Sequence, residues 1–171
     1  MSRVRLLGFL VVLAVAVYTA TAGDDSGGTP QSGQGSVGRV VRVVDGDTIH
    51  VRVGGREETV RYIGVDTPES VKPGTPVQCF AKRASAFNER LVAGERVRLV
   101  LDDEHRDRYG RLLAYVYRAR DNLFVNATLV TGGYAVPLTI PPNVAHADDF
   151  RRLAATARRK GRGLWSSCGS S

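Results

Sequence analysis

The stretch that decides the fold runs from residue 37 to residue 65 and reads VGRVVRVVDGDTIHVRVGGREETVRYIGV. Valine and other strand-forming residues alternate with polar residues from Val37 to Val53, and the alternation resumes from Glu57 to Val65. This period of two is typical of strands with one buried face. Gly54-Gly55 separates the two runs and is a two-residue turn signal. The stretch therefore predicts a β-hairpin.

The residues after the hairpin change to a helical period. Apolar residues recur at intervals of four, three and four residues, at Phe80, Ala84, Phe87 and Leu91. These positions share one face of a helix, so the sequence predicts a helix over residues 77–93 that Gly94 ends.

The rest of the chain alternates again and then becomes helical. Residues 95–101 and 111–118 have the strand period, whereas residues 125–131 and 145–160 have helical patterns. About five strands, with a helix inserted after the third and helices at the end, are typical of small nucleic-acid-binding barrels. The sequence therefore predicts an α+β fold, a five-stranded OB-fold β-barrel with about three helices.

Composition limits the classes of protein to consider. The chain has 171 residues, of which 43% are apolar and 24% are charged, as expected for one globular domain. No apolar stretch of membrane-spanning length follows the first twenty residues, which excludes a polytopic membrane protein. The formal net charge is +7, and 21 of the 24 basic residues are arginine. This charge favours a polyanionic partner, although a GC-rich genome also explains the arginine bias.

The amino-terminal residues have the pattern of a secretory signal peptide, predicted at residues 1–22. Two arginines precede the apolar run Leu6–Val17, and Ala20-Thr21-Ala22 is a small-x-small cleavage pattern. Cleavage would give a secreted, extracellular protein with no stable membrane association, whereas an uncleaved segment would tether it to a membrane. Residues 23–36 are rich in Gly and Ser and predict a flexible linker. The folded domain is therefore expected at residues 37–168, and we expect it to be monomeric.

The sequence contains two cysteines, Cys79 and Cys168. An even number of cysteines in an exported chain favours a disulfide, which would close a loop of about ninety residues. Two unrelated thiols are the alternative.

Charged residues gather at three places, the first of which is Asp45-Gly46-Asp47-Thr48. On an extended chain the carboxylates of Asp45 and Asp47 would share one face, as a metal site requires. Asp-Gly is also a common turn signal. The alternation that continues beyond Thr48 favours an unbroken strand over a turn.

The second group is Arg61 with the run Val65-Asp66-Thr67-Pro68-Glu69. Pro68 favours an extended Thr67, and two carboxylates with a free carbonyl form a hard-oxygen site suited to Ca²⁺ or Mg²⁺. Arg61 and Asp66 are five residues apart and would face opposite ways on a regular strand, unless Gly64 allows a bulge.

The third group is Asp107-Arg108-Tyr109-Gly110-Arg111, which opens a predicted strand. An arginine at this place can offer a bidentate fork to a phosphate. Taken singly, each of the three groups is more simply explained by a turn, a surface loop or a solvated arginine.

Together the three groups resemble the staphylococcal-nuclease-like (thermonuclease) family. The motifs DGDT, R-x-x-x-V-D-T-P-E and D-R-Y-G-R occur in the family's order and spacing, and the resemblance extends over about residues 37 to 165. It includes A-S-A-F at residues 84–87 and G-L-W at residues 163–165. The resemblance implies an OB-fold barrel that cleaves DNA and RNA with Ca²⁺.

The resemblance also implies a role for each matching residue. Metal ligation falls to Asp47 and Asp66 through their carboxylates and to Thr67 through its backbone carbonyl, with Asp45 as a neighbour behind them. The catalytic set is Arg61, Glu69 and Arg111, and the residues near the substrate phosphates are Arg108 and Tyr109.

The chain departs from the family pattern at three places. Residues 70–77 replace a lysine-rich loop, the turn at 118–123 is about two residues longer, and Thr139 stands where some members carry a tyrosine that stacks on the substrate. These differences concern affinity and product preference. The alternatives to a nuclease are a secreted OB-fold module that binds nucleic acid without cutting it, and a structural domain of the cell envelope.

Overall fold

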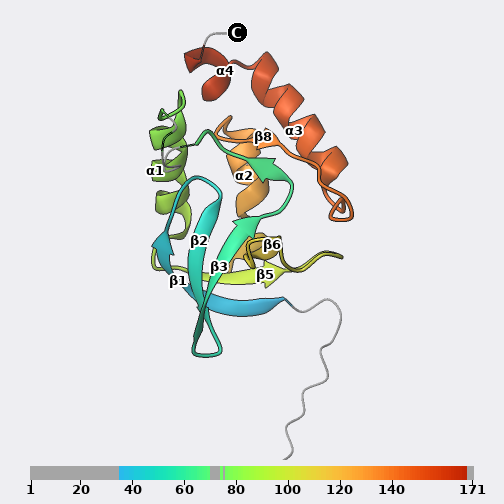
Figure 1. Ribbon diagram of the computed structural model, residues 1–171. Helices are drawn as coiled ribbons and strands as arrows, with labels where there is room; N and C mark the ends of the chain where they lie inside the picture. The colour runs from blue at the N-terminus through green and yellow to red at the C-terminus, as the bar shows by residue number, and fades with distance from the viewer. Residues whose placement is uncertain (1–34, 70–73, 75, 169–171) are drawn as a thin grey trace, which may run out of the picture. The chain divides into compact units, whose positions relative to one another are not determined.

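The computed structural model describes residues 35–69, 74 and 76–168. The predicted signal peptide, and all but the last two residues of the predicted linker, lie outside these residues. The described residues form a curved sheet at one end and a group of helices at the other (Figure 1).

Three strands follow one another as antiparallel neighbours: β1 (Ser36–Val43), β2 (Thr48–Val53) and β3 (Arg56–Tyr62). The turn between β2 and β3 is Gly54-Gly55, where both glycines have positive φ, as the hairpin prediction requires. The prediction of an unbroken strand through Asp45-Gly46-Asp47 is wrong, because β1 and β2 run in opposite directions and the chain reverses there. Alternation continues past this turn because both strands bury one face.

The sheet closes into a barrel through two further strands, β5 (Arg96–Val100) and β6 (Leu112–Arg118). The strand order is β3-β2-β1-β5-β6, and a parallel pairing of β3 with β6 joins the two ends. This closure removes the exposed edges of the sheet. The five-stranded OB-fold barrel predicted from the sequence is therefore confirmed.

Three two-residue strands add to this framework. β7 (Leu123–Phe124) extends the sheet beside β6, and β4 (Val65–Asp66) pairs with β8 (Val136–Pro137) in a small separate sheet. The β4–β8 pairing lies above the barrel among the helices in Figure 1.

The described part of the chain contains four helices: α1 (Ala81–Val92), α2 (Val125–Thr131), α3 (Ala147–Arg159) and the single turn α4 (Leu164–Ser167). α1 begins four residues later than expected, because Phe80 adopts a left-handed conformation with φ 70°. Its buried stripe is also rotated by about one residue from the predicted one: Ala81, Ala84, Asn88 and Val92 are buried.

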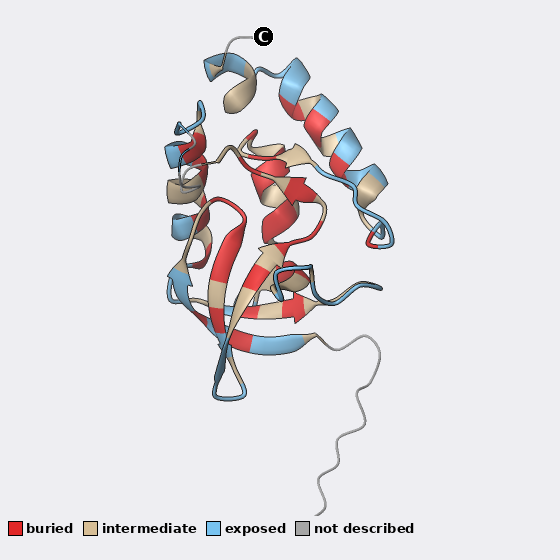
Figure 2. Cartoon of the chain, in the orientation of Figure 1, coloured by how far each residue is buried: buried red, intermediate tan, exposed pale blue. Residues whose placement is uncertain are grey.

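The core fills the barrel and continues into α2 and α3. Its largest buried side chains include Tyr62, Phe150, Ile49, Leu99 and Leu129. Figure 2 shows buried residues along the strands and on α2, and both buried and exposed residues on α3. In the described part of the chain, no helix has both the length and the apolar character of a membrane span.

Candidate active site

The turn between β1 and β2 buries Asp47. The Asp47 backbone N–H donates to Asp45 Oδ1 at 3.0 Å, and the N–H groups of Val44 and Asp45 donate to the carbonyl of Thr48. A Cβ at Gly46 would lie 2.6 Å from Thr67 Oγ1, so only glycine allows this close approach. The DGD motif is thus both a turn and the element that turns a carboxylate inward.

Thr67 supplies most of the hydrogen bonds of Asp47. Asp47 Oδ2 accepts from the Thr67 N–H at 2.7 Å and from Thr67 Oγ1 at 2.8 Å, and Oδ1 accepts from Thr48 Oγ1 at 3.2 Å. Burial raises the pKa of Asp47 to about 6, a shift that Arg61 opposes and the charge of Asp45 increases. The turn therefore holds a carboxylate whose negative charge is only partly compensated.

Arg61 joins the first two motif groups. Its Nη1 lies 3.0 Å from Asp47 Oδ1, and its Nη2 donates to Asp66 Oδ1 at 2.8 Å. Arg61 and Asp66 reach each other because β3 ends at Tyr62, and Gly64, with φ 77°, turns the chain before β4 begins. Nη1 also donates to the Val65 carbonyl at 2.9 Å, which fixes the guanidinium over this turn.

A helix residue that the motifs did not indicate supports the Asp47 turn. Asn88 is fully buried, donates from Nδ2 to the Asp45 carbonyl at 3.0 Å and accepts from the Tyr62 hydroxyl at 3.0 Å. Burial raises the pKa of Tyr62, so that its hydroxyl keeps the proton that it donates. The signal in the sequence was an asparagine four residues after Ala84, on the buried stripe of α1.

The third motif group is arranged around Asp107. Its Oδ1 accepts from the N–H groups of Tyr109 and Arg111, and its Oδ2 accepts from Arg111 Nε at 2.7 Å. Burial opposes ionisation of Asp107, but these hydrogen bonds outweigh burial and lower its pKa. Arg108 donates to the hydroxyl of the exposed Tyr109 at 2.6 Å. The loop thus presents two arginines and an aromatic ring to solvent.

Closure of the barrel brings Arg61 and Arg111 to one cavity. The parallel pairing places Arg61 on β3 opposite Leu113 on β6. Arg111 lies two residues before Leu113, directly before the start of β6, and is therefore close to Arg61. Both arginines line a cavity of about 210 Å³, which Leu138 and Ile140 also line. The Leu138 N–H donates to the Gly64 carbonyl at 3.0 Å, which holds Leu138 in place.

Glu69 lies away from this cavity's lining residues. Its backbone N–H donates to Gln78 Oε1 at 2.8 Å, and its carbonyl accepts from the Gln78 N–H at 3.0 Å. Asp66 and Thr67 line a neighbouring cavity together with Gln78 and Cys79. Gln78 therefore holds the backbone of Glu69 in place.

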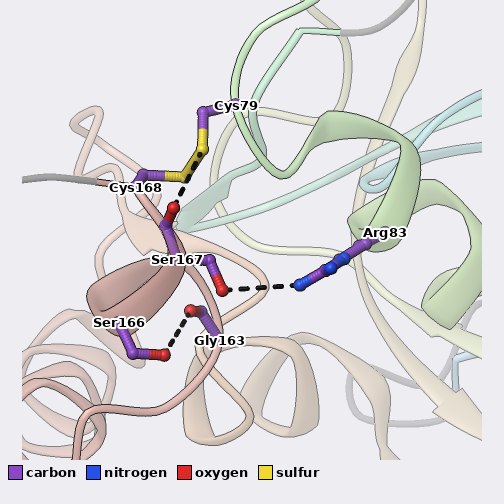
Figure 3. Close-up of a disulfide and its surroundings, with 6 residues drawn as sticks. All are labelled: Cys79, Arg83, Gly163, Ser166, Ser167 and Cys168. Carbon is purple, nitrogen blue, oxygen red and sulfur yellow. Dashed lines mark hydrogen bonds between the residues drawn. A yellow bond between two sulfur atoms is a disulfide. The ribbon is translucent and has the colours of Figure 1, made fainter.

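Cys79 and Cys168 form a disulfide, as expected from the sequence. The bond joins the start of the α1 region to the end of α4, and Arg83 Nη1 donates to Ser167 Oγ beside it at 3.4 Å (Figure 3). Because Cys79 follows Gln78 directly, the disulfide restrains the residue next to the one that bonds the Glu69 backbone.

The residues around Arg61 fit a hard divalent cation. No group of three or more His, Cys, Asp or Glu side chains is gathered in the described ranges, so a cation would have two carboxylates and neutral oxygens as ligands. Asp47 and Asp66 already converge on one positive group, the Arg61 guanidinium, and half of the Asp66 side chain is exposed. Carboxylate, carbonyl and water oxygens are the donor set of Ca²⁺.

The sequence is similar to known nucleases over most of its length. Residues 59–167 match the family model described as "Staphylococcal nuclease homologue". The chain is 36% identical to the thermonuclease of Staphylococcus hyicus over 157 residues, which cover 92% of this chain and 91% of that protein. It is 44% identical to the thermonuclease of Staphylococcus intermedius over 126 residues, or 74% of each chain. It is also 42% identical to endonuclease YncB of Bacillus subtilis over 130 residues, covering 75% of this chain and 61% of that protein. The chain therefore belongs to the staphylococcal nuclease family.

Proposed function

We propose that this protein is a secreted, Ca²⁺-dependent nuclease that hydrolyses phosphodiester bonds of DNA and RNA. The observation that carries the proposal is the convergence of Arg61 and Arg111 on one cavity, with Asp47 and Asp66 against Arg61. A phosphodiester is anionic, so attack by water requires positive charge around the phosphate. Two guanidinium groups and a metal-binding carboxylate pair meet that requirement.

Arg111 is oriented for a phosphate by Asp107. The carboxylate of Asp107 accepts a hydrogen bond from Arg111 Nε at 2.7 Å, so the two terminal nitrogens of Arg111 form the fork that faces a ligand. As negative charge builds on the phosphate oxygens in the transition state, this fork gains strength relative to the ground state. Arg111 therefore acts mainly on the transition state.

The surroundings of Arg61 differ from those of Arg111, because both terminal nitrogens of Arg61 contact carboxylates. Asp47 and Asp66 would hold Ca²⁺, which would supply positive charge to polarise the phosphodiester. Arg61, which lines the cavity together with Arg111, would donate to the phosphate oxygens. Burial and Asp45 leave the negative charge of the Asp47 carboxylate only partly compensated, which favours the binding of a cation there.

Glu69 is the remaining carboxylate of the proposed catalytic set. It would accept a proton from the attacking water or orient that water. The two hydrogen bonds between Glu69 and Gln78 hold the backbone from which its side chain would reach the substrate. Arg108 and the exposed Tyr109 would contact substrate phosphates at the rim.

The amino-terminal pattern supports the secreted part of the proposal. A signal peptide at residues 1–22 would be removed, and a flexible linker would follow at residues 23–36. A monomeric nuclease domain would comprise residues 37–168. The disulfide between Cys79 and Cys168 fits an oxidising compartment.

Incubation of the full chain with plasmid DNA, with Ca²⁺ and with excess chelator, tests the function. Cleavage with Ca²⁺ that stops with chelator supports the proposal. Binding of DNA without cleavage in either condition would identify a non-catalytic binding module instead. An Arg111→Lys variant, assayed in parallel, controls for a contaminating nuclease.

A further inference from the structure

The outer face of the barrel carries a row of three arginines on three neighbouring strands. Arg39 on β1 is the direct cross-strand partner of Arg52 on β2 and of Arg96 on β5. All three are exposed and lie on the outward side of their strands, since their chain neighbours Gly38, Val51 and Val97 are buried. Directly opposed residues have Cβ atoms about 5 Å apart, so the row brings three positive charges together.

This row is unfavourable for the fold by itself. Like charges directly opposite each other on a sheet destabilise it. Within the described ranges Arg39 and Arg96 form no ion pair, and Arg52 has only Glu57, at 3.9 Å. Arg39 donates instead to a neutral group, the Gly94 carbonyl, at 2.7 Å. The positive charge of the row is therefore largely uncompensated.

The row borders a cleft on the same face. This cleft has a volume of about 390 Å³ and is lined by Arg39 and Arg96 together with Glu95 and Arg120. Arg120 Nε lies 3.3 Å from Glu95 Oε1, so these two charges offset each other. The net charge of the cleft therefore comes from Arg39 and Arg96. Figure 2 shows exposed residues along part of β1.

The row is separate from the candidate active site. Arg52 lies five residues along β2 from Asp47, a separation of about 16 Å at the rise of a strand. Arg39 and Arg52 lie toward the ends of β1 and β2 that are remote from the Asp47 turn. A ligand that contacts both the row and the active site must therefore be extended.

We propose that the arginine row at Arg39, Arg52 and Arg96 is an auxiliary site that binds the phosphate backbone of a nucleic acid whose cleavage point lies in the active site. Phosphates recur along a strand at spacings that arginines on adjacent strands can match, and this recognition requires no base sequence. A single OB fold holds about 4–16 nucleotides, enough to reach beyond the active site. The inference rests on the proposed nuclease function only for its choice of ligand.

Binding without cleavage provides the first test. The full chain is titrated into a fluorescent single-stranded oligonucleotide of about 30 nucleotides, in excess chelator, and anisotropy is recorded over a range of salt concentrations. The variant R39Q/R52Q/R96Q should bind about 5- to 50-fold more weakly at low salt, and the slope of log K against log salt should fall by about 2. R39K/R52K/R96K, which keeps the charge, should recover most of the affinity.

The control variant removes the same charge elsewhere. R151Q/R152Q/R159Q changes three exposed arginines on α3 and should leave affinity within about twofold. Because the row is self-repulsive, R39Q/R52Q/R96Q should keep or raise the melting temperature, which a thermal melt checks. Equal weakening by the two glutamine variants would overturn the proposal, since net charge alone would then explain binding.

Cleavage kinetics provide the second test. With Ca²⁺, R39Q/R52Q/R96Q should raise KM for the long oligonucleotide but not for a trinucleotide, with kcat unchanged for both. A failure of the proposed nuclease function would abolish cleavage by every variant yet leave the anisotropy result intact. Unchanged oligonucleotide binding, together with lost binding to phosphatidylglycerol vesicles, would assign the row to a membrane surface and overturn the proposal.

Discussion

Arg61 and Asp47 form an ion pair inside the protein, with Nη1 3.0 Å from Oδ1 and side chains only 14% and 6% exposed. Asp47 lies in the turn between β1 and β2, and Arg61 lies near the end of β3, so their pairing joins this turn to that strand. Removing one partner of such a pair leaves the other buried and unpaired, which is strongly destabilising. The roles of these residues are therefore best tested by substitutions that keep the charge, such as Arg→Lys, or that keep the shape of the side chain, such as Asp→Asn.

The two cavity arginines should act on the transition state. Arg111→Lys keeps the charge but loses the fork held by Asp107, so we expect kcat to fall by about 10²–10³. Arg61→Lys should have a comparable effect. Arg108→Lys, at the exposed rim, should change mainly KM. Steady-state kinetics on a short single-stranded oligonucleotide at saturating Ca²⁺ measures all three, and an Arg111→Lys change confined to KM would reduce Arg111 to a docking charge.

Asp47 should make the metal-free protein less stable as the pH rises. The pKa of its carboxyl is raised by folding from 3.8 to about 6, so its favourable contribution is complete below about pH 4 and is lost as the pH rises through about 6. Asp47→Asn should remove this pH dependence. Between pH 4 and pH 7 the free energy of unfolding of the variant should therefore rise relative to that of the wild type by on the order of 1–3 kcal/mol.

Urea unfolding in excess chelator, from pH 4 to pH 7, measures this difference. The same variant should lose Ca²⁺-dependent cleavage, because a metal-binding carboxylate is gone. A variant that loses stability relative to the wild type as the pH rises would show instead that the ionised carboxylate stabilises the fold through Arg61.

The disulfide should stabilise the domain and position Gln78, which bonds the backbone of Glu69. It links residues 89 apart, which the chain-entropy model values at about 4–5 kcal/mol. The double variant C79S/C168S should show this loss in urea unfolding, and it should also lower kcat, because Gln78 would no longer be anchored next to Cys79. Two alkylatable thiols in unreduced protein, measured by mass spectrometry, would contradict the bond itself.

Asn88 should position the Asp47 turn. Asn88→Ala leaves the Asp45 carbonyl and the Tyr62 hydroxyl without their partner, so we expect a loss of about 1–3 kcal/mol and a several-fold weaker Ca²⁺ affinity. Tyr62→Phe keeps the bond from Asn88 to Asp45 and should affect Ca²⁺ affinity less. Calorimetric titration with Ca²⁺ compares the two variants, and unchanged affinity in Asn88→Ala would make its role purely structural.

The sequence by itself determined the local elements and the class of fold. Alternation, helical period and Gly54-Gly55 are set by neighbours in the chain, so they identified the helices, most of the strands and the five-stranded barrel, but they missed the reversal between β1 and β2. The three motifs identified the family in the same way, since each is a run of a few residues. The parity of Arg61 and Asp66, five residues apart, raised a conflict that local pattern alone left open.

Only the tertiary structure decided how these residues meet. Gly64 turns the chain so that Arg61 reaches Asp66, and the parallel pairing of β3 with β6 brings Arg111 to the same cavity from fifty residues further along the chain. The reversal at Gly46 and the role of Asn88 were likewise settled by contacts with Thr67 and Asp45. The physical reason is that periodicity reports which face of an element is buried, whereas strand register and long-range hydrogen bonds determine what that face contacts.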